Sequence, residues 1–145
     1  MKRINEYRKL FNVEQDTDLK QLKTTYRNLV KEWHPDKFPE GDAMAVEAEQ
    51  NSRRIIDGYH FLVSISPETI AATKEEYSAN IESGIADFKL KGQMLEVSFL
   101  DGSTYEYFGV SKNIYIRLIN ADKQFRFAKR NIFDSYLYRK SKKAA

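Results

Sequence analysis

The residues best suited to recognition chemistry lie in a short, proline-containing segment in the first third of the sequence. His34, Pro35 and Asp36 stand together there, and Lys37 follows them. Proline restricts the backbone, so the aspartate is a charge of limited direction that suits an arginine on another surface. A cationic stripe precedes the segment at helical spacing: Lys20, Lys23, Arg27 and Lys31. Such a stripe steers a molecule toward an acidic surface, so the pattern predicts a site for binding another macromolecule.

Enzyme chemistry is not indicated by the residue types. The 145 residues include no cysteine and two histidines, which excludes disulfides, thiolate metal sites, a cysteine nucleophile and a histidine-rich metal cage. The sequence also lacks a glycine-rich phosphate loop and a nucleophile–base pair, and its carboxylates are scattered. We therefore expect no catalytic residue, no metal and no cofactor.

The composition is that of a globular protein with a hydrated surface, with 41% hydrophobic and 31% charged residues. No apolar run approaches the roughly 20 residues that a membrane helix needs. The N-terminal residues turn polar at once, so no secretory signal is expected. We expect no membrane partner, and the absence of cysteine fits a cytoplasmic setting.

Two predicted helices flank the proline-containing segment and must position it. From residue 18 to residue 33, apolar residues recur every three or four positions, which predicts one buried helix face. Thr17 or Asp16 is the expected N-cap, and Pro35 disfavours helical geometry in the residue before it. A second helix is expected over about 42–64, and two such helices joined by a short loop should pack antiparallel.

A change of periodicity marks the second half of the chain. Ser66-Pro67-Glu68 predicts one more helix, which should run to about Ala79. Beyond it the apolar residues alternate, which predicts three strands: 85–90, 94–99 and 104–108. Asp101-Gly102 predicts a hairpin turn with positive φ at both positions. Ser111 is expected to cap a following helix.

The charge balance changes near the same place. The net charge is −2 over residues 1–80 and +5 over residues 81–145. We place the boundary at about 81–84 and expect an α+β chain of two domains. Residues 1–80 should form an all-α helical hairpin domain, and residues 84–140 a small antiparallel β-sheet with one helix.

The first half resembles the J-domains of DnaJ-type co-chaperones over roughly residues 4–78. The matching residues stand at the J-domain spacing: Glu6-Tyr7, Leu10, Val13, Leu22-Lys23, Tyr26-Arg27, Leu29, His34-Pro35-Asp36-Lys37, Ile56, Gly58-Tyr59, Leu62 and Ser66-Pro67-Glu68. The resemblance implies docking on the ATPase domain of a DnaK-type heat-shock chaperone and stimulation of its ATP hydrolysis. The implied contacts are Asp36, Pro35 and His34, with Lys23 and Arg27 and, less directly, Lys20, Lys31 and Lys37.

Three positions depart from the J-domain pattern. Asn28 stands where the family usually has a basic residue, and Glu32 is acidic where a basic residue is common. Arg53 replaces a usual core phenylalanine. The first two departures would weaken docking or narrow the choice of chaperone. The third indicates a locally different core, or an arginine whose stem packs while its head reaches water. The alternative to a docking site is a simple helix-ending turn beside a hydrated lysine face.

The second half resembles the KTSC domain over residues 85–137. The resemblance rests on the strand Leu95-Glu96-Val97, the turn Asp101-Gly102-Ser103, Tyr105-Glu106-Tyr107-Phe108, Val110, Tyr115, Ala121, Phe125-Arg126-Phe127, Ile132 and Tyr136. Departures include Asp122 and Gln124, where small residues are typical. The resemblance implies a fold and no established activity.

The aromatic and basic residues of this half have two interpretations. Tyr105 and Tyr107 share one strand face, and exposed tyrosines flanked by cations would suit stacking against single-stranded RNA. The cations that would contact phosphates are Arg117, Arg126, Lys129 and Arg130. A small sheet also needs bulky residues for its core, so we favour a core position for both tyrosines and a hydrated face for the cations.

Three functions follow from these patterns. The first is a co-chaperone whose second domain selects a client protein or a location. The second is an RNA-binding protein whose first domain recruits a DnaK-type chaperone. The third is an adaptor whose first domain has lost its partner. Steep salt dependence would indicate phosphate contacts, whereas chaperone docking should be lost on Asp36→Asn.

Overall fold

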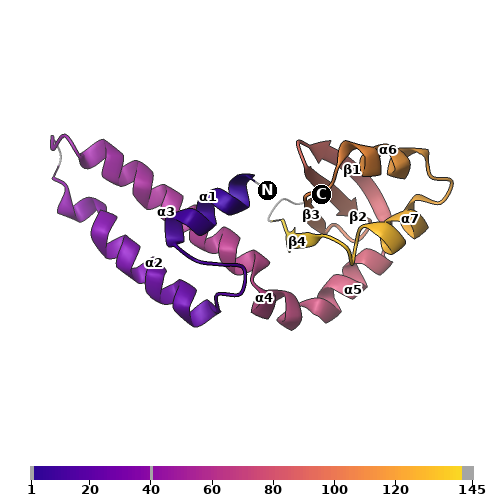
Figure 1. The fold of residues 1–145 in the computed structure, drawn as a ribbon, viewed down its shortest axis with the longest axis horizontal. Coiled ribbons are helices and arrows are strands. Elements are labelled where there is room, and N and C mark those ends of the chain that lie inside the picture. The colour runs from indigo at the N-terminus through magenta and orange to yellow at the C-terminus, as the bar shows by residue number, and fades with distance from the viewer. Residues whose placement is uncertain (1, 40, 142–145) are drawn as a thin grey trace. The chain divides into compact units, whose positions relative to one another are not determined.

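A computed structural model describes residues 2–39 and 41–141 of the chain. The chain divides into two compact units, with the division between Thr69 and Ile70. The first unit is helical and the second is a sheet covered by helices (Figure 1). The α+β fold class predicted from the sequence is therefore confirmed.

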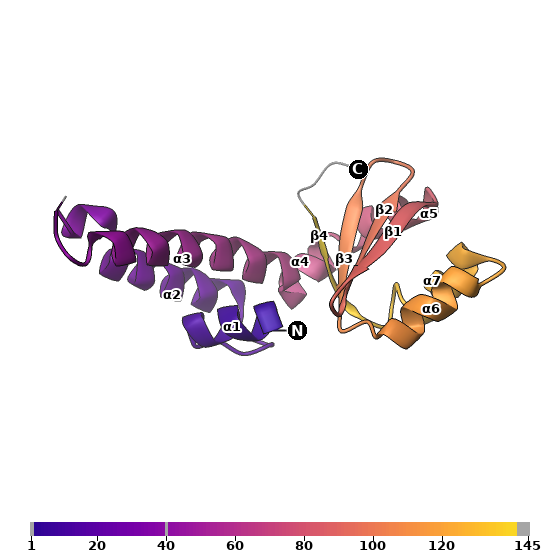
Figure 2. The same ribbon diagram turned by 90° about the horizontal axis from the view of Figure 1, so that it is seen from above.

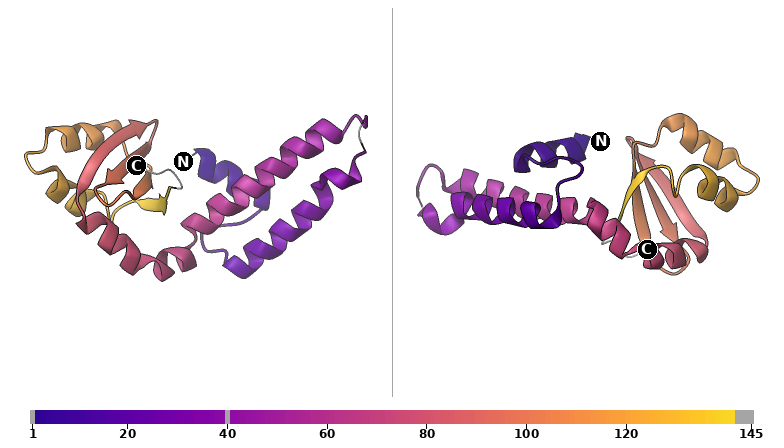
Figure 3. Two further views of the ribbon diagram at one scale, coloured as in Figure 1. Left: turned by 180° about the vertical axis from the view of Figure 1, so that it is seen from behind. Right: turned by 60° about the horizontal axis from the view of Figure 1, so that its bottom comes forward.

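The first unit is built on an antiparallel pair of long helices. α2 (Leu19–Trp33) and α3 (Ala45–Ile65) lie side by side along their length (Figure 2). A 3₁₀ turn, η1 (Pro35–Lys37), begins the connection between them. α1 (Lys2–Phe11) packs on α3, as the two views in Figure 3 also show. The hairpin places the proline-containing segment at one end of the unit.

The start of α2 differs from the prediction by one residue. Asp18 is the N-cap, and its Oδ1 accepts a hydrogen bond of 2.8 Å from the Gln21 backbone N–H. Thr17 and Asp16, the two predicted caps, lie before it. The Thr17 hydroxyl instead accepts from the Glu14 backbone N–H at 2.9 Å and closes the preceding turn. Asp16, Thr17 and Asp18 are all residue types that cap helices, so the spacing of the apolar residues alone does not identify the N-cap among them.

The apolar stripes of the three helices meet in a small core. Its buried apolar residues are Ile4, Phe11, Leu22, Ala48, Ile55, Phe61, Leu62 and Ile65. Gly58 of α3 lets α1 approach closely, because a Cβ there would lie 2.8 Å from Tyr7 Cδ1 and 3.2 Å from Phe11 Cε1. The close approach makes glycine a packing requirement at this helical position.

The helix predicted from Ser66 to Ala79 is broken into two. α4 (Pro67–Ala72) and α5 (Lys74–Glu82) are separated at Thr73. The division of the chain falls within α4, whereas the predicted boundary lies near 81–84. The physical reason is that α5 buries Tyr77 and Ile81 in the core of the second unit.

The sheet of the second unit has four antiparallel strands in chain order. They are β1 (Ile85–Lys91), β2 (Met94–Phe99), β3 (Thr104–Phe108) and β4 (Leu137–Lys140). α6 (Lys112–Asn120) and α7 (Gln124–Asn131) connect β3 to β4. Ser111 caps α6 as predicted, accepting from the Ile114 N–H at 3.3 Å. β4 and α7 are additions to the three strands and one helix expected from the sequence.

The turn between β2 and β3 is also different from the prediction. Gly102 has a φ of 91°, but Asp101 does not have positive φ, so only one of the two expected left-handed positions is present. The loop closes through the Gly102 N–H to Phe99 O at 3.0 Å and the Phe99 N–H to Ser103 O at 2.8 Å. Hydrogen bonds from Ser103 hold the pKa of the Asp101 carboxyl below its usual value.

Aromatic rings and their hydroxyls hold the second unit together. The Tyr77 hydroxyl donates to the Phe133 carbonyl at 2.8 Å and lies 2.8 Å from the Tyr107 hydroxyl. The Tyr105 hydroxyl donates to Asn80 Oδ1 at 2.6 Å. Burial is the main cause of a raised pKa at four hydroxyls: Tyr77, Tyr105, Tyr107 and Tyr138. Buried hydroxyls are stable in a core when they find such partners.

A row of charged residues crosses the other face of the sheet. Lys89, Glu96, Glu106 and Arg139 are paired in register on the four strands. Arg139 Nη1 donates to Glu106 Oε1 at 2.9 Å, and both side chains are buried. Lys89 Nζ lies 3.5 Å from Glu96 Oε1. The cations compensate two carboxylates that are otherwise costly to bury side by side.

Candidate partner-binding surface

The end of α2 is converted directly into the turn that holds the aspartate. His34 has an extended backbone, with φ −60° and ψ 131°, so the helix stops there. Pro35 then begins η1, in which the Lys37 N–H donates to the His34 carbonyl and the Phe38 N–H donates to the Pro35 carbonyl, both at 3.0 Å. The proline and these two hydrogen bonds fix the direction of the turn.

The imidazole side chain of His34 also closes the turn. His34 Nδ1 accepts a hydrogen bond of 3.1 Å from the Asp36 backbone N–H. Asp36 Oδ2 lies 3.5 Å from the same Nδ1. His34 thus orients the Asp36 backbone and leaves the carboxylate available to a partner.

The carboxylate of Asp36 is presented to solvent. Its side chain is 93% exposed, whereas that of His34 is 49% exposed. The turn is supported from inside by Trp33 and Phe38, whose stacked rings have centroids 6.0 Å apart. Phe38 was not singled out from the sequence, although an apolar residue directly after a polar turn indicates a side chain that packs beneath the turn. Phe38 is partly buried there.

Four of the predicted cations lie along the exposed face of α2, and Lys37 ends η1. Lys20, Lys23, Arg27, Lys31 and Lys37 are all exposed. On the other face of the helix, Tyr26 stacks on Tyr59 of α3 with ring centroids 4.1 Å apart. The aromatic contact orients the helix so that its charged face meets solvent. Turn and cations therefore belong to one continuous element, α2 and its C-terminal turn.

The departures from the J-domain pattern are also on the surface. Asn28 and Glu32 are exposed on α2, among the cations. Arg53 of α3 is exposed as well, and its Nη2 lies 2.9 Å from Glu49 Oε1 one helical turn away. The arginine does not fill the core position of a phenylalanine, so its effect on the core of this unit is small.

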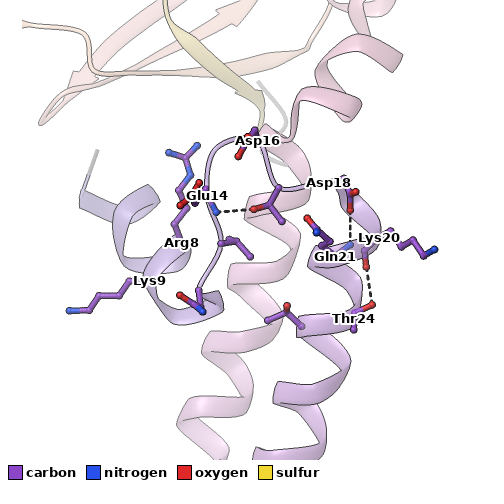
Figure 4. A pocket seen from close by; sticks show the side chains of 12 residues that line it. Arg8, Lys9, Glu14, Asp16, Asp18, Lys20, Gln21 and Thr24 are labelled. Carbon is purple, nitrogen blue, oxygen red and sulfur yellow. Dashed lines mark hydrogen bonds between the residues drawn. The ribbon is translucent and has the colours of Figure 1, made fainter.

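A surface hollow of the first unit lies at the opposite end of α2 (Figure 4). Its lining combines the cations Arg8, Lys9 and Lys20 with the carboxylates of Glu14, Asp16 and Asp18. Several of its polar groups already cap the helix or close the loop, including Asp18 and Thr17. Of the predicted contact residues, this hollow includes Lys20, and the His34–Asp36 turn is not part of it.

The tyrosines proposed for base stacking are in the core. Tyr105 is 3% exposed and Tyr107 is fully buried, so neither ring face is available to a nucleotide. Arg117, Arg126, Lys129 and Arg130 are exposed on α6 and α7. The guanidinium of Arg117 lies over the Phe127 ring at 5.3 Å, and Lys129 Nζ lies 2.7 Å from Glu82 Oε1. The structure brings the cations together without the aromatic surface that the RNA interpretation needs.

The described part of the chain, residues 2–39 and 41–141, has no cluster of three or more histidine, aspartate or glutamate side chains placed to hold a metal ion. None of its helices is both long and apolar enough to cross a bilayer.

Comparison with known families divides the chain in the same way as its fold. Residues 6–67 match the family model of the DnaJ domain, and residues 78–136 match that of the KTSC domain. The chaperone protein DnaJ of Thermotoga sp. (strain RQ2) and that of Thermotoga maritima are each 38% identical to this chain over 61 residues. That of Thermotoga petrophila is 39% identical over 57 residues.

These alignments cover 42%, 42% and 39% of this chain. They span about a sixth of the length of the DnaJ proteins, 16%, 16% and 15% respectively. The similarity to DnaJ is thus a similarity of one domain, the one that carries the His34–Asp36 turn. The chain joins a DnaJ domain, of the type found in DnaJ-type co-chaperones, to a KTSC domain.

Proposed function

We propose that the chain is a co-chaperone that docks on a DnaK-type chaperone of the cytoplasm and stimulates its ATPase. The observation that carries the proposal is the oriented, 93% exposed carboxylate of Asp36 at the end of a cationic helix. The ATP hydrolysis belongs to the partner, and this chain biases the partner's conformational equilibrium by binding one of its states. In this proposal the chain itself is not an enzyme.

The turn supplies the specific part of the contact. An aspartate fixed by Pro35 and by the His34 hydrogen bond loses little conformational freedom when it binds. A guanidinium on the partner can receive such a carboxylate in a charge-assisted hydrogen bond. In this proposal Asp36 makes the contact itself, and His34 and Pro35 orient it.

The cations of α2 supply the long-range part of the contact. Lys23 and Arg27 lie in the middle of the exposed face, with Lys20, Lys31 and Lys37 around them. Charges of one sign on one face accelerate the encounter with a surface of the opposite sign. Glu32 on the same helix lowers this attraction, so we expect a narrower choice of chaperone than a fully basic face would give.

The second unit has a different role in the proposal. It folds as a separate unit and contains none of the residues proposed above for docking. We propose that it selects the client protein or the location of the complex. The RNA-binding alternative is less supported, because both proposed stacking rings are buried.

The experiment is single-turnover ATP hydrolysis by a DnaK-type chaperone from the same cell, with and without this chain. The full chain should stimulate hydrolysis, and Asp36→Asn should reduce the stimulation at least about tenfold, as expected when one partner of an interfacial charge pair is removed. Asp16→Asn is the matched control, because Asp16 is an exposed aspartate outside the turn. Stimulation by Asp36→Asn equal to that by the unmodified chain would refute the assignment of the turn.

A second pair of variants tests the cationic face. Lys23→Glu with Arg27→Glu should abolish most of the stimulation at low salt, and the loss should shrink as salt screens the charges. Lys2→Glu with Lys9→Glu, at exposed positions of α1, is the charge-matched control. Equal stimulation by both variants would show that the α2 cations do not steer docking.

A further inference from the structure

The helix pair α6–α7 combines exposed cations with exposed isoleucines. Lys112, Ile116 and Ile119 of α6 follow one another at spacings of four and three, which places them along one side of the helix. Ile116 is 43% exposed and Ile119 is 48% exposed. Both differ from Leu118, which is fully buried in the core of this unit. The outer side of α6 is therefore apolar as well as basic.

α7, which packs against α6, carries further exposed positive charge. Arg126 and Arg130 are one helical turn apart and exposed, and α7 packs directly against α6 (Figure 2). Within the described residues, Lys129 alone of the α6–α7 cations forms an ion pair with a carboxylate, at Glu82. Asp122 is the single acidic residue between Lys112 and Asn131. The surface has an unbalanced positive charge.

The rings in this region are already covered. Lys129 Nζ lies 5.8 Å from the centroid of the Phe125 ring, and Arg117 lies over Phe127. Single-stranded nucleic acids bind through open aromatic faces on which bases stack. The apolar groups that remain exposed are aliphatic, and aliphatic ridges match the apolar side chains of a peptide helix better than they match a sugar–phosphate backbone.

The small apolar area also argues against a lipid surface. A helix that lies on a membrane buries a broad apolar face. Most apolar side chains of α6, namely Ile114, Tyr115 and Leu118, pack into the core of their own unit, which leaves Ile116 and Ile119 exposed. Two half-exposed isoleucines are enough for an anchor in a small protein interface, where a few central residues carry most of the binding free energy.

We propose that the α6–α7 surface, defined by Lys112, Ile116, Ile119, Arg126 and Arg130, binds an acidic amphipathic helix of a protein partner. The isoleucines contact the apolar residues of that helix, and the lysine and arginines contact its carboxylates. The proposal is independent of chaperone docking, because it uses no residue of the first unit. It gives the second unit a chemical preference for the segment that it selects.

The test is fluorescence anisotropy of a labelled synthetic helix of about 15 residues, which carries leucines on one face and glutamates on the other. The full chain should bind it saturably. Ile116→Ser with Ile119→Ser, and separately Arg126→Glu with Arg130→Glu, should each weaken binding about tenfold or more. Lys2→Glu with Lys9→Glu, at exposed positions of α1, should change binding less than about twofold and is the charge-matched control.

Four further measurements make the result decisive. A peptide of the same composition with its leucines distributed around the helix should bind at least about tenfold more weakly. Asp36→Asn should leave peptide binding unchanged, which separates this surface from the His34–Asp36 turn. Amide shifts in ¹H–¹⁵N spectra should map to α6 and α7. Circular dichroism of each variant should stay native, since the substituted side chains are exposed.

The proposal is overturned by any of three results. The first is no saturable binding of the acidic peptide by a folded chain. The second is binding that the isoleucine variant leaves intact, which would indicate charge attraction alone. The third is displacement of the peptide by oligouridine or by vesicles containing phosphatidylserine, with tighter binding of either one, which would assign the surface to RNA or to an anionic membrane.

Discussion

The first unit exposes its most distinctive side chains, whereas the second unit buries its own. Asp36 lies on a solvent-facing turn that a few backbone hydrogen bonds hold in place. Tyr105 and Tyr107 lie under helices, where ring contacts and hydroxyl partners hold them. The difference teaches that a proline-fixed turn can hold a polar group in solvent, whereas aromatic residues that alternate along a strand can form a core.

The energetic consequences differ in the same way. Replacing an exposed carboxylate changes a binding surface and leaves the fold intact, because surface substitutions have small effects on stability. Replacing a buried ring changes the fold and leaves the docking turn intact. Trp33 is the single tryptophan and lies in the first unit, so its fluorescence reports the unfolding of that unit separately.

Tyr107→Ala should have the largest effect on stability. Tyr107 is fully buried against Phe133, with ring centroids 5.7 Å apart, and its hydroxyl pairs with that of Tyr77. We expect a loss of about 4 kcal/mol in the free energy of unfolding of the second unit. Urea unfolding followed by near-ultraviolet circular dichroism of the tyrosines measures it.

Tyr107→Phe is the conservative control, since it removes only the hydroxyl and should cost about 1 kcal/mol. The Trp33 transition should be the same in both variants. A shift of the Trp33 transition as large as that of the tyrosine signal would mean that the two units unfold together, and the comparison between them would fail.

Gly58→Ala should destabilise the first unit and spare the second. Alanine normally favours a helix over glycine by about 1 kcal/mol, but the new Cβ would lie 2.8 Å from Tyr7 Cδ1. The overpacking should outweigh the helix preference and give a net loss of about 2 kcal/mol. The Trp33 fluorescence transition in urea measures this loss. Gln50→Ala, at an exposed position of α3, is the control. A stabilised variant would show that α1 shifts to make room for the new Cβ at little cost in free energy.

Alkaline pH should act on the second unit through its buried tyrosines. Because burial raises the pKa of Tyr77, Tyr105, Tyr107 and Tyr138 above the unfolded value near 10, the unfolded state releases protons first. Their stabilising contribution is complete below pH 10 and is lost as pH rises, by up to about 1.4 kcal/mol per tyrosine and pH unit.

Absorbance at 295 nm, recorded together with circular dichroism, checks this pH dependence. The four phenolates should appear only as the second unit unfolds. If all nine tyrosines of the chain ionise near pH 10 while the circular dichroism stays native, the core hydroxyls are open to solvent and the contrast between the units is smaller than described.

Asp18→Ala should have the smallest of these effects. The variant removes the 2.8 Å cap bond to the Gln21 N–H at the start of α2, for a loss of about 1 kcal/mol. Thr17→Ala serves as comparison, because its hydroxyl closes the preceding turn. An Asp18→Ala chain with unchanged thermal stability, measured by Trp33 fluorescence, would transfer the capping role to another residue.

Much of the fold followed from local patterns. The spacing of apolar residues predicted α2, α3 and the first three strands, because apolar side chains recur along them at the period of a helix or of a strand. Pro35 predicted the end of α2 because the residue before a proline avoids helical geometry. The composition of the docking turn could be read in the same way, since its geometry depends on neighbours in sequence.

Other features depended on distant residues and could not be read locally. β4 is four residues long, and its assignment as a strand comes from pairing with β3 across two helices. The break at Thr73 reflects the burial of Tyr77 in another core. Asp101 avoids positive φ because its side chain, held by Ser103 and Asn80, stabilises a wider loop. Tertiary contacts decide each of these cases.

The order of the strands also has a consequence for the time course of synthesis. The packing of the first unit involves residues up to 69, so it can be completed while later residues are still being added. The sheet of the second unit waits for β4, which supplies Arg139 to the buried Glu106. Until then a carboxylate and the edge of β3 stay without their partners. The chain under synthesis therefore carries a completed His34–Asp36 turn while the sheet of its second unit is still incomplete.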